Sequence, residues 1–250
     1  MQRGAGGRGA RGVGLRAGPR RLMPTAPGRY AALLALVVAG AIAGGLMGGP
    51  WLWLHYACKP LATLMVLAWV LRAVPVVSVR YKRAIAAGVV FSLVGDVLLM
   101  LPQGLFLGGL VAFLLAHLCF IVALWPGGGL RANALVVCAY AALAAVNVGL
   151  LWPHVPGDMR VPVLAYVAVL VLMAALAAAR AWALRGDAAL AGPARLAAVG
   201  GALFVLSDSL LAWNHFRGGL PLALLWVLAG YYASLWCIAR SVARSAGQGA

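Results

Sequence analysis

The sequence predicts an all-α integral membrane protein, a polytopic bundle of about eight transmembrane helices with both termini in the cytoplasm. Of its 250 residues, 65% are hydrophobic and only 10% are charged, and the mean hydropathy is +0.99. A soluble domain carries about a quarter charged residues. The apolar residues gather in runs of about 20, the length of helix that crosses a bilayer. These observations exclude a soluble globular domain.

The apolar runs follow one another along the chain and are separated by basic or helix-breaking residues. Gly48-Gly49-Pro50 separates the first run from the second, and Pro126-Gly127-Gly128-Gly129 separates the fourth from the fifth. Gly and Pro are the strongest punctuation between helices. Loops at 72–83 and 180–195 separate two further pairs. The predicted helices are 30–47, 51–71, 84–101, 105–125, 132–152, 161–184, 195–213 and 221–239.

The two ends of the chain differ in composition from the apolar region. Residues 1–29 contain seven Arg and no acidic residue, so they cannot build a core. We therefore expect a disordered basic tail at 1–29, a transmembrane helical domain at 30–243 and a disordered tail at 244–250.

The basic residues predict the orientation of the helices. Seventeen Lys and Arg residues fall on the side of the N-tail, the 72–83 and 180–195 loops, Arg131 and the C-tail, whereas only Arg160 and Arg217 fall on the other side. Cytoplasmic loops carry the excess of Lys and Arg, so both termini should be cytoplasmic. The net charge of +16 therefore reflects topology, and we expect no nucleic-acid partner. Richness in Ala, Gly and Arg is typical of high-GC bacteria and predicts a bacterial plasma membrane.

Few charged residues are available for chemistry within the membrane. The sequence has no Glu, and its four acidic residues are all Asp. Asp158 and Asp187 fall in loops beside Arg residues, where a solvated charge is expected. Lys59, Asp96 and Asp208 fall inside apolar runs. A charge at membrane depth costs a few kcal/mol or more and is normally kept for function, so these three residues are the candidate site.

The spacing of these charges along their helices predicts that they share one layer. Asp96 and Asp208 each lie thirteen residues beyond a cytoplasmic base, Arg83 and Arg195 respectively. At about 1.5 Å per residue, both lie about 20 Å up their helices. Lys59 lies about 14 Å down a helix that enters from the opposite side. We expect all three groups to lie in the outer half of the bilayer, with a structural ion pair between Lys59 and one Asp as the alternative.

Polar side chains on the same helical faces extend the candidate site. Residues four apart stack on one side of a helix, which aligns His55 and Thr63 with Lys59. Ser92 and Gln103 accompany Asp96, and Ser207, Ser209 and His215 accompany Asp208. His117 is either catalytic or a hydrogen-bonded core residue, and the tyrosine pair at 231–232 lines either a pocket or the core. The residues predicted to tune charge or bind substrate are Lys59, His117, Ser92, Ser207, Tyr231 and Tyr232.

Five sequence blocks resemble the lysoplasmalogenase family, also called the YhhN family, of eight-span membrane proteins. The blocks are Lys59-Pro60-Leu61, F-S-L-V-G-D-V-L-L at 91–99, F-L-L-A-H at 113–117, F-V-L-S-D-S-L-L-A-W at 204–213 and Tyr231-Tyr232-Ala233. The resemblance implies cleavage of the vinyl ether bond of lysoplasmalogens to a fatty aldehyde and a glycerophospho-alcohol, with no cofactor. It implies Asp96 and Asp208 as the catalytic pair. The chain departs from the family at Phe120, where Tyr is usual, and at Leu235, where Gln is usual.

The chemistry of this reaction fits two intramembrane carboxyl groups. An acid protonates the enol ether carbon, and a carboxylate stabilises the resulting oxocarbenium ion or activates water. With one ammonium near two acids, we expect one Asp to be ionised against Lys59 and the other to hold its proton. The phosphate of the lysophospholipid substrate would contact Arg217 or the outer loops if it enters from outside, and the basic cytoplasmic loops if it enters from inside.

Two other functions compete with this hypothesis. Proton-coupled carriers and lipid-binding membrane proteins also hold Asp and Lys within the membrane, and the break predicted at Lys59-Pro60 is typical of carriers. A zinc-dependent lipid hydrolase needs several His ligands at helical spacing. The sequence has no H-x-x-x-H pattern, and its four cysteines are isolated inside apolar runs. We therefore expect no metal site.

Overall fold

The computed structural model describes residues 27–101, 104–125 and 134–245, which form eight helices long and apolar enough to cross a membrane. This confirms the predicted number of spans and the all-α fold class. Short 3-10 turns lie at Gly49–Trp51, Trp152–His154 and Gly157–Met159. The helices are α1 (Pro27–Met47), α2 (Leu52–Arg72), α3 (Val79–Met100), α4 (Phe106–Leu124), α5 (Ala134–Leu151), α6 (Arg160–Ala183), α7 (Ala191–Phe216) and α8 (Ala223–Arg240).

Several helices extend a few residues beyond their predicted bounds. α3 begins at Val79 instead of residue 84, because the Ser78 side chain caps it by accepting a hydrogen bond from the Tyr81 backbone N–H at 3.0 Å. α1 begins inside the segment predicted as the basic tail. At the other end, Arg244 and Ser245 donate backbone hydrogen bonds to the carbonyls of Pro75 and Ala189. The remaining predicted tail residues lie outside the described ranges.

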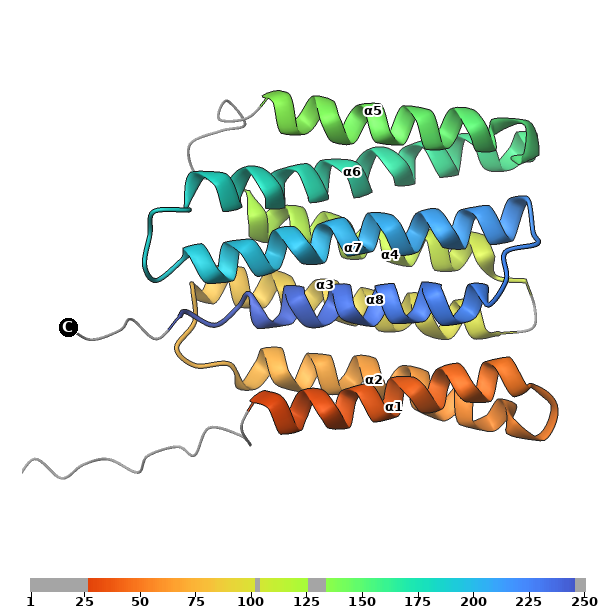
Figure 1. The fold of residues 1–250 in the computed structure, drawn as a ribbon, viewed down its shortest axis with the longest axis horizontal. Coiled ribbons are helices and arrows are strands. Elements are labelled where there is room, and N and C mark those ends of the chain that lie inside the picture. The colour runs from red at the N-terminus through yellow and green to blue at the C-terminus, as the bar shows by residue number, and fades with distance from the viewer. Residues whose placement is uncertain (1–26, 102–103, 126–133, 246–250) are drawn as a thin grey trace, which may run out of the picture.

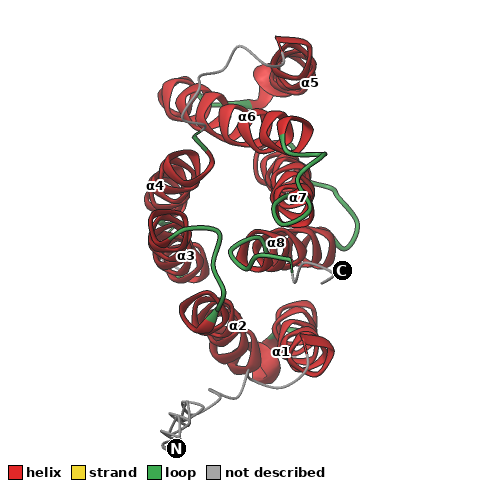
Figure 2. Cartoon of the chain, turned by 90° about the vertical axis from the view of Figure 1, so that its left-hand side faces the viewer, coloured by secondary structure: helices red, strands yellow, loops and turns green. Residues whose placement is uncertain are grey.

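Successive helices run antiparallel, so the start of α1 and the end of α8 lie at the same end of the bundle (Figure 1). We call this the proximal end, and the opposite end, where α2, α4, α6 and α8 begin, the distal end. Seen along the helices, α2, α3, α4, α6, α7 and α8 form a closed ring, with α1 against α2 and α8 and α5 against α6 (Figure 2). This placement of the start of α1 and the end of α8 at one end agrees with the predicted topology. That the proximal side is cytoplasmic stays a prediction.

A close approach between α3 and α4 positions an aromatic ring that matters for the site. A Cβ atom added at Gly95 of α3 would lie 2.6 Å from the Cε2 atom of Phe113 on α4, so only Gly leaves room for this ring. Small residues allow membrane helices to approach closely. The Phe113 ring is thereby fixed against Gly95, the residue that precedes Asp96 on α3.

The predicted break at Lys59-Pro60 is wrong, because α2 is one continuous helix from Leu52 to Arg72 with Pro60 inside it. Proline removes one backbone hydrogen-bond donor from a helix. In a membrane bundle, neighbouring helices and side chains can satisfy the carbonyl groups that such a proline frees. Nearby, the Lys59 carbonyl accepts a hydrogen bond from the Tyr232 hydroxyl of α8 at 2.6 Å. Lys59 therefore belongs to a packed helix and not to an unwound segment.

Candidate active site

Lys59 and Asp96 form a buried ion pair between α2 and α3. The Lys59 Nζ atom lies 3.5 Å from Asp96 Oδ1 and 3.3 Å from the Asp96 backbone carbonyl oxygen. The two residues are only 6% and 1% exposed. Lys59 and Asp96 therefore lie at one level along their helices, as expected, and the ammonium compensates a charge that would otherwise be buried alone. Their place in the outer half of the bilayer stays a prediction.

Hydroxyl groups complete the surroundings of Asp96. Thr63 and Tyr231 donate hydrogen bonds to Asp96 Oδ2 at 2.6 Å and 2.7 Å. We call Lys59, Thr63, Asp96, Tyr231 and Tyr232 the Asp96 cluster; it joins α2, α3 and α8, and all five side chains are buried. Both carboxyl oxygens of Asp96 have partners. The cluster is a satisfied polar network, which can hold an ionised carboxylate in a low-dielectric interior.

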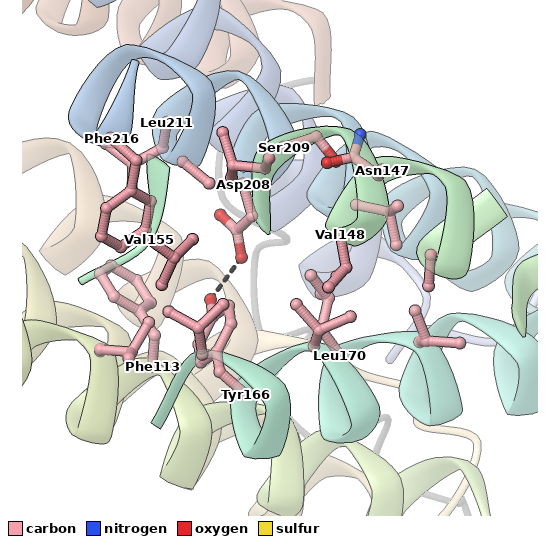
Figure 3. A pocket seen from close by; sticks show the side chains of 18 of the residues that line it. Phe113, Asn147, Val148, Val155, Tyr166, Leu170, Asp208, Ser209, Leu211 and Phe216 are labelled. Atoms are coloured by element: carbon pink, nitrogen blue, oxygen red, sulfur yellow. Dashed lines mark hydrogen bonds between the residues drawn. The ribbon is translucent and has the colours of Figure 1, made fainter. Parts of the chain in front are cut away.

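Asp208 lies in a different place, on the wall of an apolar pocket. The Tyr166 hydroxyl of α6 donates a hydrogen bond to Asp208 Oδ2, and Figure 3 shows the two groups pointing toward one another. This leaves Oδ1 for a ligand or a proton. Ser209 and Asn147 are the other polar lining residues apart from these two. Apart from Leu99 of α3, the lining comes from α4, α5, α6 and α7 and from Val155 in the turn before α6.

The pocket extends from the distal end of the bundle toward its middle. Phe106, Val155 and Phe216, near the helix ends, line one part of it, and Leu170 lines a deeper part. Phe113 also lines the pocket and packs its ring edge to face against Tyr231, with centroids 5.6 Å apart. Phe113 therefore stands between the Asp208 pocket and the Asp96 cluster.

The structure does not bring Asp208 to the ammonium of Lys59. In the described part of the chain, Asp208 has Tyr166 as its hydrogen-bond partner, and Lys59 is paired with Asp96. The expectation of one ammonium beside two acids is therefore wrong in this respect. Sequence depth alone places groups at a level but does not say which helices face one another, and α2 and α7 lie on different parts of the ring.

His117 lies between the two sites without a polar partner in the described residues. It is fully buried, and neither ring nitrogen has a hydrogen-bond partner there. Its ring packs against Phe204 and Tyr166, with centroids 4.6 Å and 5.4 Å apart. His117 thus touches the Tyr166 ring and not a carboxyl group.

The predicted serines do not reach either carboxyl group. Ser207 donates its hydroxyl to the Val227 carbonyl of α8 at 2.9 Å, whereas its neighbour Ser209 lines the pocket. Ser92 is buried with no hydrogen-bond partner among the described residues. His55 Nδ1 lies 2.7 Å from the Ala41 carbonyl oxygen, and Gln103 lies outside the described ranges.

Tyr166 is the functional candidate that sequence analysis missed. It stands six residues after Arg160 on α6, about 9 Å into the membrane, while Asp208 stands eight residues before the end of α7, about 12 Å in. The two helices are neighbours in the ring. A tyrosine at the same depth as an intramembrane acid was the available signal.

Within the residues that the structure describes, no three His, Cys, Asp or Glu side chains gather as a metal site would require. The fold and the site thus define an integral membrane protein of the polytopic helical class, with one carboxyl group in a satisfied polar cluster and another in an apolar pocket.

Residues 54–242 match the model of the YhhN family, and the chain belongs to this family. The chain is 34% identical to lysoplasmalogenase TMEM86B of Sus scrofa over 201 residues, which cover 78% of this chain and 77% of that protein. It is 33% identical to the Homo sapiens TMEM86B over 75% of this chain and 74% of that protein. A lysoplasmalogenase of Mycobacterium bovis is 35% identical over 55% of this chain and 51% of its own length. No solved structure matches.

Proposed function

We propose that this protein is a lysoplasmalogenase, a membrane-embedded hydrolase that cleaves the vinyl ether bond of lysoplasmenyl-ethanolamine or lysoplasmenyl-choline. The products are a fatty aldehyde and a glycerophospho-alcohol. The observation that carries the proposal is the Asp208 carboxyl group, held by Tyr166 on the wall of an apolar pocket. An apolar pocket suits an alkenyl chain, and a carboxyl group supplies the acid that an enol ether needs. The names of the relatives support the same reaction.

The first step is proton transfer to carbon. Asp208 donates its proton to the vinyl carbon that is not bonded to oxygen, and the electron pair of the double bond forms the new C–H bond. The neighbouring carbon and the ether oxygen then share the positive charge of an oxocarbenium ion. Tyr166 donates its hydroxyl hydrogen bond to Oδ2, which fixes the carboxyl group and leaves Oδ1 to carry the proton. The ionised Asp208 then lies next to the cation that it has created.

The second step adds water and returns the enzyme to its starting state. A water molecule attacks the carbon bonded to oxygen and gives its proton to the Asp208 carboxylate, which forms a hemiacetal. The hemiacetal hydroxyl proton then moves to the glycerol oxygen as the C–O bond breaks. Aldehyde and glycerophospho-alcohol leave, and Asp208 is protonated again. One water is consumed, and no cofactor is required.

Asp96 is the second member of the proposed carboxyl pair, and it acts from behind the pocket wall. Lys59, Thr63 and Tyr231 stabilise its ionised form. Its negative charge favours formation of the cation in the pocket. Tyr231 connects the two sites, because its hydroxyl donates a hydrogen bond to Asp96 and its ring packs against Phe113, which lines the pocket. The protein would therefore keep Asp96 ionised and Asp208 protonated. Its proposed location is a bacterial plasma membrane.

The test is aldehyde release by the protein purified in detergent. Lysoplasmenyl-ethanolamine is offered beside its saturated ether and its acyl analogue, and we expect aldehyde from the first substrate alone. Fatty acid from the acyl analogue would make the protein an ester hydrolase instead. If no substrate is consumed, while proteoliposomes take up lysophospholipid in response to a pH gradient, the carrier hypothesis replaces this one.

A further inference from the structure

The wall of the Asp208 pocket at its distal end is a small hydrophobic cluster separate from the main core. Leu151, Val155 and Val163 form its buried centre. Met159 precedes α6, while Trp213 and Phe216 lie in the last turn of α7; all three pack against this centre. We call these six residues the mouth cluster. It joins the start of α6 to the end of α7, and most of its members also line the pocket.

Two arginines extend from the mouth cluster. Arg160 directly follows Met159, and Arg217 directly follows Phe216. The Arg160 guanidinium lies 4.9 Å from the centroid of the Trp152 ring, and its Nε donates a hydrogen bond to the Val155 carbonyl at 3.4 Å. Stacking on a neighbouring ring and bonding to the backbone hold the guanidinium beside the rim of the pocket.

Arg217 stacks on a tryptophan of the mouth cluster. Its guanidinium lies 5.3 Å from the centroid of the Trp213 ring. The Trp213 indole N–H in turn donates to the pocket-lining Asn147 at 3.3 Å. Both arginines thus contact a residue of the mouth cluster: Arg160 contacts Val155, and Arg217 contacts Trp213.

Neither arginine is neutralised by an acid in the described part of the chain, where the ion pair is the one between Lys59 and Asp96. Both are exposed, and Asp158, two residues before Arg160, makes no ion pair with it there. A guanidinium presents donors in a fork that matches a phosphate group. Two unpaired guanidinium groups beside the opening of an apolar pocket favour a ligand with an anionic head and an apolar tail.

We propose that Arg160 and Arg217 bind the phosphate of the lysophospholipid at the mouth of the Asp208 pocket. The vinyl ether then lies beside Asp208, and the hydrocarbon chain fills the deeper part of the pocket. This inference rests on the proposed function for the identity of the substrate. It assigns substrate entry to the leaflet at the distal end, which the distribution of bases predicts to be the outer one.

The experiment compares binding of two ligands that the proposed reaction cannot consume. The first is the saturated alkyl-ether lysophosphoethanolamine, and the second is the same alkylglycerol without phosphate. Arg160→Gln and Arg217→Gln should each raise the Kd of the phosphate-bearing ligand about tenfold, since each removes a charge-assisted contact. The Kd of the alkylglycerol should stay unchanged. Intrinsic tryptophan fluorescence in detergent micelles provides the readout.

Arg185→Gln is the matched control. Arg185 also stacks on a tryptophan, 4.5 Å from the centroid of Trp182, but it follows α6 at the proximal end. This variant should bind both ligands as the unaltered protein does. Because Arg160 and Arg217 are exposed, all three variants should keep the thermal stability of the unaltered protein.

Three results would overturn the inference: equal loss of affinity for both ligands, equal loss in the Arg185→Gln control, or no preference of the unaltered protein for the ligand with phosphate. The measurement needs no turnover. If the protein binds the phosphate-bearing ligand through these arginines but releases no aldehyde from lysoplasmenyl-ethanolamine, the proposed function fails and the phosphate site stands.

Discussion

The two intramembrane carboxyl groups differ in how completely the protein satisfies them. Both oxygens of Asp96 have partners: an ammonium faces one, and two hydroxyl groups donate to the other. Among the described residues, Asp208 has a single hydrogen-bond partner, the Tyr166 hydroxyl, and its side chain lines the pocket. Asp96 is 1% exposed, whereas Asp208 is only partly buried. The structure thus gives the same residue type two different surroundings.

This difference suggests that Asp96 matters for folding as well as activity, whereas Asp208 matters for activity. In a buried ion pair such as Lys59 and Asp96, removal of one partner leaves the other charge uncompensated. A carboxyl group with one oxygen free can exchange a proton with a ligand. The comparison therefore predicts that changes at Asp208 affect turnover and leave folding intact, while changes in the Asp96 cluster affect both.

The largest effect is expected from Asp208→Asn, which should lower kcat by about 10³-fold or more, because an amide cannot donate the proton. The amide oxygen can still accept the Tyr166 hydrogen bond, so the melting temperature should stay within about 1 °C. Aldehyde release and thermal unfolding of the same preparation provide the measurement. Asp158→Asn, on an exposed turn, is the control. A near-normal rate for Asp208→Asn contradicts the proposed mechanism.

Asp96→Asn should also abolish turnover, but with a loss of stability that Asp208→Asn does not show. The variant leaves the Lys59 ammonium buried without a counter-charge, which costs about 3–5 kcal/mol. Adding Lys59→Met to Asp96→Asn removes that ammonium and should restore most of the stability without restoring turnover. Thermal unfolding of the single and double variants decides the point. If Asp96→Asn is as stable as Asp208→Asn, the distinction between the two sites is wrong.

Most of the fold could be predicted from the sequence, because each span is a run of apolar residues of membrane length and needs no tertiary information. Depth, which depends only on residue count along each helix, correctly placed Lys59 and Asp96 at one level, but it left open which Asp pairs with Lys59. Depth does not predict which helices are neighbours in the ring. Tyr166 was missed because it contacts Asp208 across two helices, and Ser207 was preferred over Ser209 because the face of α7 that lines the pocket is set by packing alone.

Tyr166→Phe tests the Asp208 side of the comparison with a smaller expected effect. It removes the hydroxyl that donates to Asp208 Oδ2 and keeps the ring that packs against His117. We expect kcat to fall about tenfold, the effect of one hydrogen bond to a charged group, with KM nearly unchanged. Tyr140→Phe, on α5 and outside the pocket lining, should have the full rate. Equal rates for the two variants would show that Tyr166 does not orient the acid.

Lys59→Met tests the Asp96 side through the pH profile. An ammonium favours the ionised form of the carboxylate beside it, so without Lys59 the Asp96 carboxyl group should ionise only at higher pH. A reaction that needs ionised Asp96 should then have its optimum shifted to higher pH and a lower rate at neutral pH. The loss of stability should be smaller than that of Asp96→Asn, because the carboxyl group left without its partner can take up a proton and become neutral. Rates across the pH range and thermal unfolding are measured on one preparation. An unmoved optimum together with a lower melting temperature would make the ion pair a structural lock only.

Chelation should have the smallest effect on either site, because the proposed steps use only carboxyl and hydroxyl groups and water. The histidines nearest to these groups have other surroundings: His55 contacts the Ala41 carbonyl, and His117 packs among aromatic rings. A metal site needs at least three protein ligands, and the described residues bring no such group together. Incubation with EDTA followed by the aldehyde assay should therefore give an unchanged rate. If EDTA abolishes turnover and zinc restores it, a metal takes part, and the free oxygen of Asp208 becomes the first ligand to test, since no other carboxyl group lines the pocket that the structure describes.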